Sequence, residues 1–140
     1  MPVWLIYALV STVFAGLTAV LAKVGIQKLS SDLGLAIRTI AVLGFVLLNL
    51  FLWGGNKELP QITLRSLIFL ILSGLTTAVS WICYYRAMQL GTVSWVAAID
   101  KGSIVITILL SVWLLKEPLT PRLALGAGLI VAGLLVHVWK

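Results

Sequence analysis

The stretch VWLIYALVSTVFAGLTAVLA, residues 3–22, contains no charged side chain and decides the fold class. A helix needs about 20 predominantly apolar residues to cross the hydrocarbon core of a bilayer, and this stretch has that length. Trp4 stands near its start and Lys23 directly follows its end, as expected for an interfacial aromatic ring and a snorkelling cation. The stretch therefore predicts a transmembrane helix.

Four more apolar stretches follow, at about residues 35–53, 67–85, 93–115 and 123–139. Short connections separate them, among them a predicted loop, GGNKELP at 54–60, and a predicted link, RAMQLGT at 86–92. The chain is 61% hydrophobic and 10% charged, whereas soluble domains have about 45–50% apolar and about 25% charged residues. We therefore predict an all-α integral membrane protein with five transmembrane helices, forming a single domain over residues 1–140.

The ten Lys and Arg residues are scattered over connections and helix ends, so the net charge of +6 does not indicate a nucleic-acid partner. Because positive charges bias membrane orientation, we compared the two sides of the predicted membrane. The side of the amino terminus carries Lys57, Arg65, Lys116 and Arg122, and the other side carries Lys23, Lys28, Arg38, Arg86 and Lys140. This near balance leaves dual topology open, in which two oppositely inserted copies form an inverted repeat.

Two charged residues interrupt the fourth predicted span. Asp100 lies roughly 10 Å from its start, and inserting an ionisable residue near a helix centre costs on the order of 2.5–3.5 kcal/mol. Neighbouring residues on a helix point about 100° apart, so we expect Asp100 and Lys101 to find different partners. Arg38 and Arg86 are the candidates on the same side of the membrane. The sequence leaves open whether this charge network is structural or lies beside a solute path.

Polar side chains also form a line along each of two predicted spans. The lines are Asp100, Ser103, Thr107 and Ser111, and Ser73, Thr77, Ser80 and Tyr84 with Trp81 and Tyr85 adjoining. Offsets of three and four place each line on one helix face. We predict a solute path lined by Asp100, Lys101, Trp81, Tyr84, Ser80, Thr77, Ser103 and Thr107. In the alternative, the hydroxyl groups only bond to the backbone of their own helix or join neighbouring helices by hydrogen bonds.

Small residues recur every four positions in the fifth predicted span, at Ala124, Gly128 and Ala132. Such a face lets another helix backbone approach closely. The sequence leaves open whether that helix belongs to the same chain or to a second copy, and a homodimer is one hypothesis.

No enzymatic or metal-binding arrangement is predicted. The chain has one His and one Cys, and no cluster has the spacing of metal ligands. We expect neither a cofactor nor a metal, and the expected partners are the lipid bilayer and a small-molecule solute.

Several motifs give the chain a family resemblance over almost its whole length. They are LAKVGIQ at residues 21–27, AIRTI at 36–40, YYRAMQLG at 84–91, IDKGS at 99–103, LLKEPLT at 114–120 and LGAGLIVAG at 125–133. In their order and spacing, these motifs resemble a single EamA-type domain of the drug/metabolite transporter (DMT) superfamily, in its short five-helix bacterial or archaeal branch.

The resemblance implies half of a ten-helix fold built from two inverted repeats, and hence an antiparallel homodimer in the cell membrane. It also implies secondary transport of a small polar metabolite, such as an amino acid or a sugar nucleotide, by alternating access. The similar four-helix multidrug exporters use a carboxylate in the first helix, which this chain lacks, so proton-coupled export of cations is doubtful unless Asp100 has that role. The surplus of positive charge around Asp100, from Arg38, Arg86 and Lys101, suits a zwitterionic or anionic solute better than a cationic one. The competing interpretation is a membrane interaction subunit or lipid-carrier chaperone without transport of its own.

Overall fold

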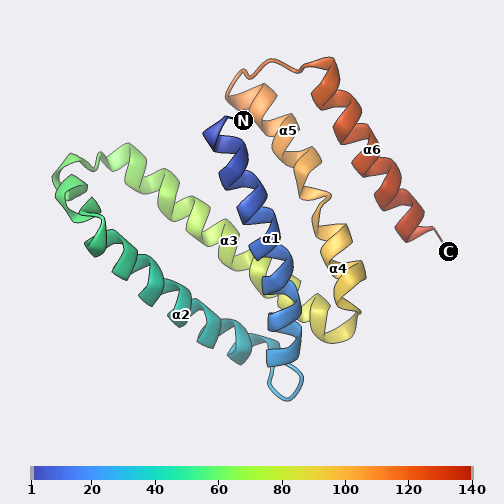
Figure 1. Cartoon of the computed structure of the whole chain (residues 1–140), viewed down its shortest axis with the longest axis horizontal. Helices are drawn as coiled ribbons and strands as arrows, with labels where there is room; N and C mark the ends of the chain where they lie inside the picture. Colours follow the sequence, from blue (N-terminus) through green and yellow to red (C-terminus); the bar gives the residue numbers. More distant parts are fainter. Residues whose placement is uncertain (1, 140) are drawn as a thin grey trace. The chain divides into compact units, whose positions relative to one another are not determined.

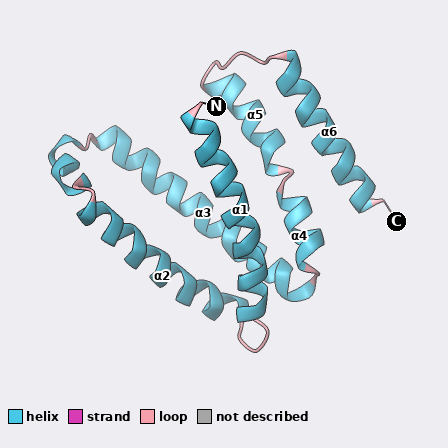
Figure 2. Ribbon diagram, in the orientation of Figure 1, coloured by secondary structure: helices cyan, strands magenta, loops and turns pink. Residues whose placement is uncertain are grey.

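The computed structural model describes residues 2–139, apart from the side chains of Asn56 and Val138, and every regular element in them is a helix (Figures 1 and 2). The elements are α1 (Val3–Gly25), α2 (Ser31–Leu52), the 3₁₀ helix η1 (Gly55–Gln61), α3 (Leu64–Leu90), α4 (Val93–Asp100), α5 (Ser103–Leu114) and α6 (Pro121–Val138). Helices α1, α2, α3 and the stretch formed by α4 and α5 are long and apolar enough to span a membrane, and α6 is a shorter apolar helix. The predicted five-helix membrane fold is confirmed. Lys140, one of the flanking cations, lies outside the described residues.

The chain divides into two compact units, Met1–Leu90 and Gly91–Lys140. In unit 1, α2 and α3 form a hairpin, and η1 makes the turn between them (Figure 1). Gly54 stands between α2 and η1 with a φ of 73°, in the left-handed region that glycine adopts without strain. The stretch predicted as a loop is therefore mostly a tight helical turn.

In unit 2, α4 and α5 are two halves of one span, and α6 returns beside them (Figure 1). The fourth span was predicted as one helix in which charged residues interrupt the apolar stretch, but the structure divides it into two helices, with the break at Lys101 and Gly102. At this break the backbone hydrogen bonds join residues three positions apart, as in a 3₁₀ helix, instead of four. For example, Lys101 N–H donates to the carbonyl of Ala98 at 3.1 Å. Gly102 faces α6 closely, because a Cβ at this position would lie 3.3 Å from Cδ1 of Leu134.

The predicted link at residues 86–92 is wrong. Helix α3 continues to Leu90, so that Arg86 is a helical residue and only Gly91 and Thr92 separate α3 from α4. The physical reason is helix propensity, since Arg, Ala, Met, Gln and Leu are all good helix formers. Hydropathy falls near Arg86, but the tendency to form a helix does not.

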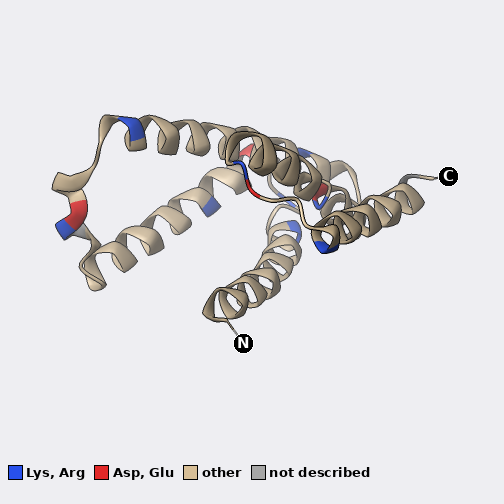
Figure 3. Cartoon of the chain, turned by 90° about the horizontal axis from the view of Figure 1, so that it is seen from above, with Lys and Arg blue, Asp and Glu red and all other residues tan. Residues whose placement is uncertain are grey.

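Few side chains are buried within the described chain, and all of them belong to unit 1. They are Ala19, Ile26, Ser31, Tyr85 and Met88. Most large apolar side chains are exposed along the helices, as expected where lipid tails form the surroundings. Charged residues are sparse and lie mostly toward helix ends and connections (Figure 3).

Candidate functional site

An arginine that lies over a tryptophan ring forms the centre of the candidate site in unit 1. The guanidinium carbon of Arg38 on α2 lies 3.7 Å from the ring centroid of Trp81 on α3, a cation–π contact. Trp81 contacts two tyrosine rings of the same helix, with centroid distances of 5.5 Å to Tyr84 and 5.9 Å to Tyr85. Tyr85 is buried, so the aromatic group is held at one end by packing.

Two cavities adjoin this arginine. One, of about 310 Å³, lies between α2 and α3, with Arg38, Thr39, Thr77 and Trp81 among its lining residues. The other, also about 310 Å³, is lined mostly by apolar residues of α1 and α2, together with Arg38 and Tyr85. Arg38 therefore lines both cavities, and two of the predicted path residues, Thr77 and Trp81, line the first.

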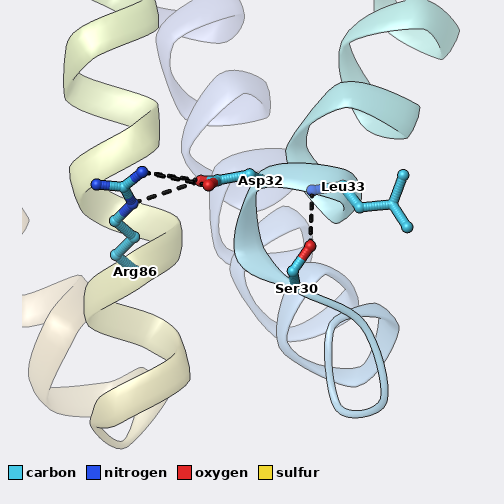
Figure 4. A network of polar contacts seen from close by, with 4 residues as sticks. All are labelled: Ser30, Asp32, Leu33 and Arg86. Atoms are coloured by element: carbon cyan, nitrogen blue, oxygen red, sulfur yellow. Dashed lines mark hydrogen bonds and ion pairs between the residues drawn. The ribbon is translucent and has the colours of Figure 1, made fainter.

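A separate polar cluster joins α3 to the start of α2 (Figure 4). Arg86 donates to both carboxylate oxygens of Asp32, and the shortest distance, from Nη2 to Oδ2, is 3.2 Å. Asp32 is held in the first turn of α2, whose capping residue Ser30 accepts a hydrogen bond from Leu33 N–H at 3.2 Å. Asp32 is thus a partner of Arg86 within unit 1, and contact between Arg86 and Asp100 stays a prediction.

Two further long-range hydrogen bonds reinforce this end of unit 1. Gln89 donates from Nε2 to the carbonyl of Leu29 at 2.8 Å, and Lys23 donates from Nζ to the carbonyl of Met88. The end of α3 is therefore connected by polar contacts to the end of α1 and to the turn that follows it.

In unit 2, Asp100 and Lys101 form an ion pair at 3.6 Å, and both side chains are well exposed. The expectation that these neighbours find different partners is therefore wrong. The helix breaks at Lys101, so the geometry of two successive residues on a continuous helix does not apply to them. Contact between Asp100 and Arg38 stays a prediction.

The hydroxyl groups of the two predicted lines behave partly as the alternative expected. Thr77 donates to the carbonyl of Ser73 at 2.8 Å, and Thr107 donates to that of Ser103 at 3.0 Å. Each of these hydroxyls has used its proton on its own helix, but its oxygen can still accept a hydrogen bond. Ser80 and Ser103 have exposed side chains on α3 and α5.

The small residues of α6 are exposed within unit 2. No atom outside the local helix lies within 4 Å of a Cβ built on Gly128, and Ala124 and Ala132 are also exposed. Helix α6 contacts α4 elsewhere, for example through His137, whose ring lies 5.3 Å from that of Trp95. The small-residue face therefore stays open in this unit.

Sequence reasoning missed two residues of unit 1. Asp32 pairs with Arg86, and Thr39 lines the cavity between α2 and α3. Asp32 lies between the first two predicted spans, at about residues 3–22 and 35–53, although a serine followed two residues later by an acidic residue is a common start of a helix. Thr39 could have been found from its position next to Arg38 on the predicted second span. Among the described residues, no three His, Cys, Asp or Glu side chains gather as metal ligands.

Comparison with known proteins adds the family. Residues 2–139 match the EamA-like transporter family. The chain belongs to this family. A protein of Sinorhizobium sp., described as an uncharacterized transporter in the cobO 3′ region, is 41% identical over 133 residues, which make up 95% of this chain and 94% of that protein. No solved structure matches the chain.

The resemblance to the DMT superfamily is thereby confirmed, and this EamA-like protein is a multi-pass membrane transporter. Both the family and the relative point to transport rather than to catalysis.

Proposed function

We propose that this EamA-like protein is a secondary transporter that moves a small polar metabolite, such as an amino acid or a sugar nucleotide, by alternating access. The supporting observation is the cavity of about 310 Å³ between α2 and α3, with Arg38, Thr77 and Trp81 in its wall. Pockets of about 300–1,000 Å³ with mostly apolar walls and a few polar groups are typical small-molecule sites. The proposed path is lined by Asp100, Lys101, Trp81, Tyr84, Ser80, Thr77, Ser103 and Thr107.

We propose further that two copies assemble as an antiparallel homodimer in a bacterial or archaeal cell membrane. The flanking cations are nearly balanced, which makes insertion in both orientations available. Gly128 and its neighbours on α6 leave an exposed face that a second helix can approach closely. The Sinorhizobium relative has nearly the same length as this chain. Two inverted copies would together form the ten helices that the superfamily resemblance implies.

Solute counterflow in proteoliposomes tests transport directly. Vesicles are loaded with one solute class at a time, amino acids, sugar nucleotides or organic acids, and uptake of the labelled solute is measured. We expect counterflow for one class, its loss in Asp100→Asn, and its retention in the control Glu117→Gln, which changes a carboxylate in the connection between α5 and α6. No counterflow for any class, with one membrane protein copurifying at fixed stoichiometry, would favour the interaction-subunit interpretation.

The assembly is tested by the mass of the protein in detergent, measured by light scattering. We expect a dimer for the natural sequence and a monomer for Gly128→Leu. The matched control is Gly16→Leu on α1, where a Cβ also meets no atom within 4 Å.

Orientation is tested by adding one Lys to each flank in turn. Variants locked in opposite orientations should be inactive alone and active together, and full activity of either alone would contradict the antiparallel dimer.

A further inference from the structure

We propose that Arg38 binds the carboxylate of the transported solute, so that the solute is a small organic anion with an apolar body. This inference rests on the proposed transport function and names the chemical class of its substrate. Three observations on Arg38 support it. Its guanidinium lies over the Trp81 ring, no group within unit 1 accepts a hydrogen bond from it, and it lines two cavities.

The stacking fixes the position of the guanidinium. With its carbon 3.7 Å from the Trp81 centroid, the group is held between α2 and α3 instead of extending along α2 toward a lipid headgroup. Stacking uses a face of the planar guanidinium, while its five N–H donors point outward from its edges. An arginine held in this way is already oriented for a planar, bidentate acceptor such as a carboxylate.

The lack of an acceptor within unit 1 distinguishes Arg38 from Arg86, Lys101 and Lys23. Arg86 is paired with Asp32, Lys101 with Asp100, and Lys23 donates to the carbonyl of Met88. Among the described residues of unit 1, no carboxylate forms an ion pair with Arg38 and no oxygen accepts a hydrogen bond from it. Arg38 lies seven residues after the start of a membrane-spanning helix, where an arginine calls for an anionic partner, and the described residues of unit 1 do not supply one.

The cavities indicate what accompanies the anionic group. Apart from Arg38, the cavity between α1 and α2 is lined mainly by Leu, Ile, Ala and Gly side chains. In the cavity between α2 and α3, Thr39 and Thr77 have donated their hydroxyl protons to their own helices. Arg38 is therefore the strong donor common to both walls, and the remaining surface favours an apolar body of small size.

The test uses benzoate as the probe, with benzamide as its neutral isostere. The melting temperature of the purified protein in a non-ionic detergent is followed as each compound is titrated, because a ligand that binds the native state raises it. We expect benzoate, but not benzamide, to raise the melting temperature in a saturable manner. In Arg38→Gln, the concentration of benzoate for half-saturation should increase at least about tenfold, since a charge-assisted hydrogen bond is lost. The control Arg65→Gln, at the start of α3, should behave like the natural sequence.

Two further variants keep the test decisive if Arg38→Gln does not fold. Arg38→Lys keeps the charge but loses the planar fork, and Trp81→Leu removes the stacking ring, so both should weaken benzoate binding. Unchanged benzoate affinity in these variants would overturn the proposal. A melting temperature that rises with phosphatidylglycerol, depends on Arg38 and does not respond to benzoate would identify a lipid headgroup as the anion, and would also overturn it.

Failure of this inference differs from failure of the transport proposal. Counterflow of a neutral or cationic solute that is unaffected by Arg38→Gln leaves transport standing and overturns the anion class. Arg38-dependent benzoate binding without counterflow of any solute supports the anion site and contradicts transport.

Discussion

The two units of the chain hold their helices together by different means. Unit 1 contains all the buried residues of the described chain, and hydrogen bonds from Lys23, Arg86 and Gln89 connect segments far apart in sequence. In unit 2, each described side-chain hydrogen bond reaches only three or four residues along the chain, as for Thr107 and His137. Unit 2 instead brings helices close at Gly102 and leaves the face of Gly128 open.

This difference favours different tasks for the two units. Lipid tails are as apolar as leucine, so helices in a bilayer associate through close packing and polar contacts rather than through the hydrophobic effect. A unit fastened by polar contacts can keep a cavity, and an arginine without an ion-pair partner in that unit, in fixed geometry. A unit with a broken helix and an open small-residue face is suited to contact another copy and to move. The predictions below test this assignment.

The largest expected effect concerns the buried end of α3. Met88 is 0% exposed, and truncation of a buried methionine removes its packing contacts. We expect Met88→Ala to lower the free energy of unfolding by about 2 kcal/mol or more, from the general range for such truncations. The measurement is unfolding in mixed micelles with increasing dodecyl sulfate, followed by circular dichroism. The control is Leu90→Ala, whose side chain is 92% exposed and should change stability by less than about 0.5 kcal/mol. Equal effects of the two variants would show that unit 1 lacks a packed core.

The sequence predicted the helices well because each span is a predominantly apolar stretch of about the length that a bilayer requires. The end of α3 escaped prediction because hydropathy drops near Arg86 while helix propensity remains high. The pairing of Arg86 with Asp32 could not be predicted either, since these residues are 54 positions apart and their contact depends on how α2 and α3 pack.

The candidate site was predicted in part. Trp81 and Thr77 were selected from their spacing, and both line the cavity beside Arg38. Their role in transport stays a prediction. The sequence predicted Arg38 as part of a charge network, because sequence shows which residues are charged but not that Arg86 and Lys101 have carboxylate partners while Arg38 has none within unit 1.

A smaller effect on stability is expected when one methyl group is added at a glycine. We compare one glycine of each unit. A Cβ at Gly34 on α2 would lie 2.5 Å from Cγ2 of Ile26, a buried and β-branched side chain that cannot rotate away easily. We expect Gly34→Ala to lower the unfolding free energy by about 1–3 kcal/mol, the general cost of overpacking. Gly128→Ala meets no atom within 4 Å and should leave the fold as stable as before.

The same two glycine variants also test whether α6 contacts a second copy of the chain. If Gly128→Ala lowers stability at high protein concentration but not at low concentration, the small-residue face is buried against another copy. A Gly34→Ala variant as stable as the natural sequence would contradict the close approach of α2 to the end of α1.

The smallest effect is expected for the ion pair between Arg86 and Asp32. The two side chains are 61% and 63% exposed, and exposed pairs of this kind contribute about 0–1 kcal/mol. A double-mutant cycle with Arg86→Gln, Asp32→Asn and both together should therefore give a coupling energy below about 1 kcal/mol. Asp32→Asn should cost more than Arg86→Gln, because Asp32 also lies in the first turn of α2, where the helix dipole favours a negative charge. A coupling energy of several kcal/mol would mean that the pair is shielded from water in the membrane. Arg86 would then contribute more to the stability of unit 1 than its exposure indicates. Arg86 and Arg38 would in that case both be shielded from water, and they would differ only in that Arg86 has a carboxylate partner in unit 1.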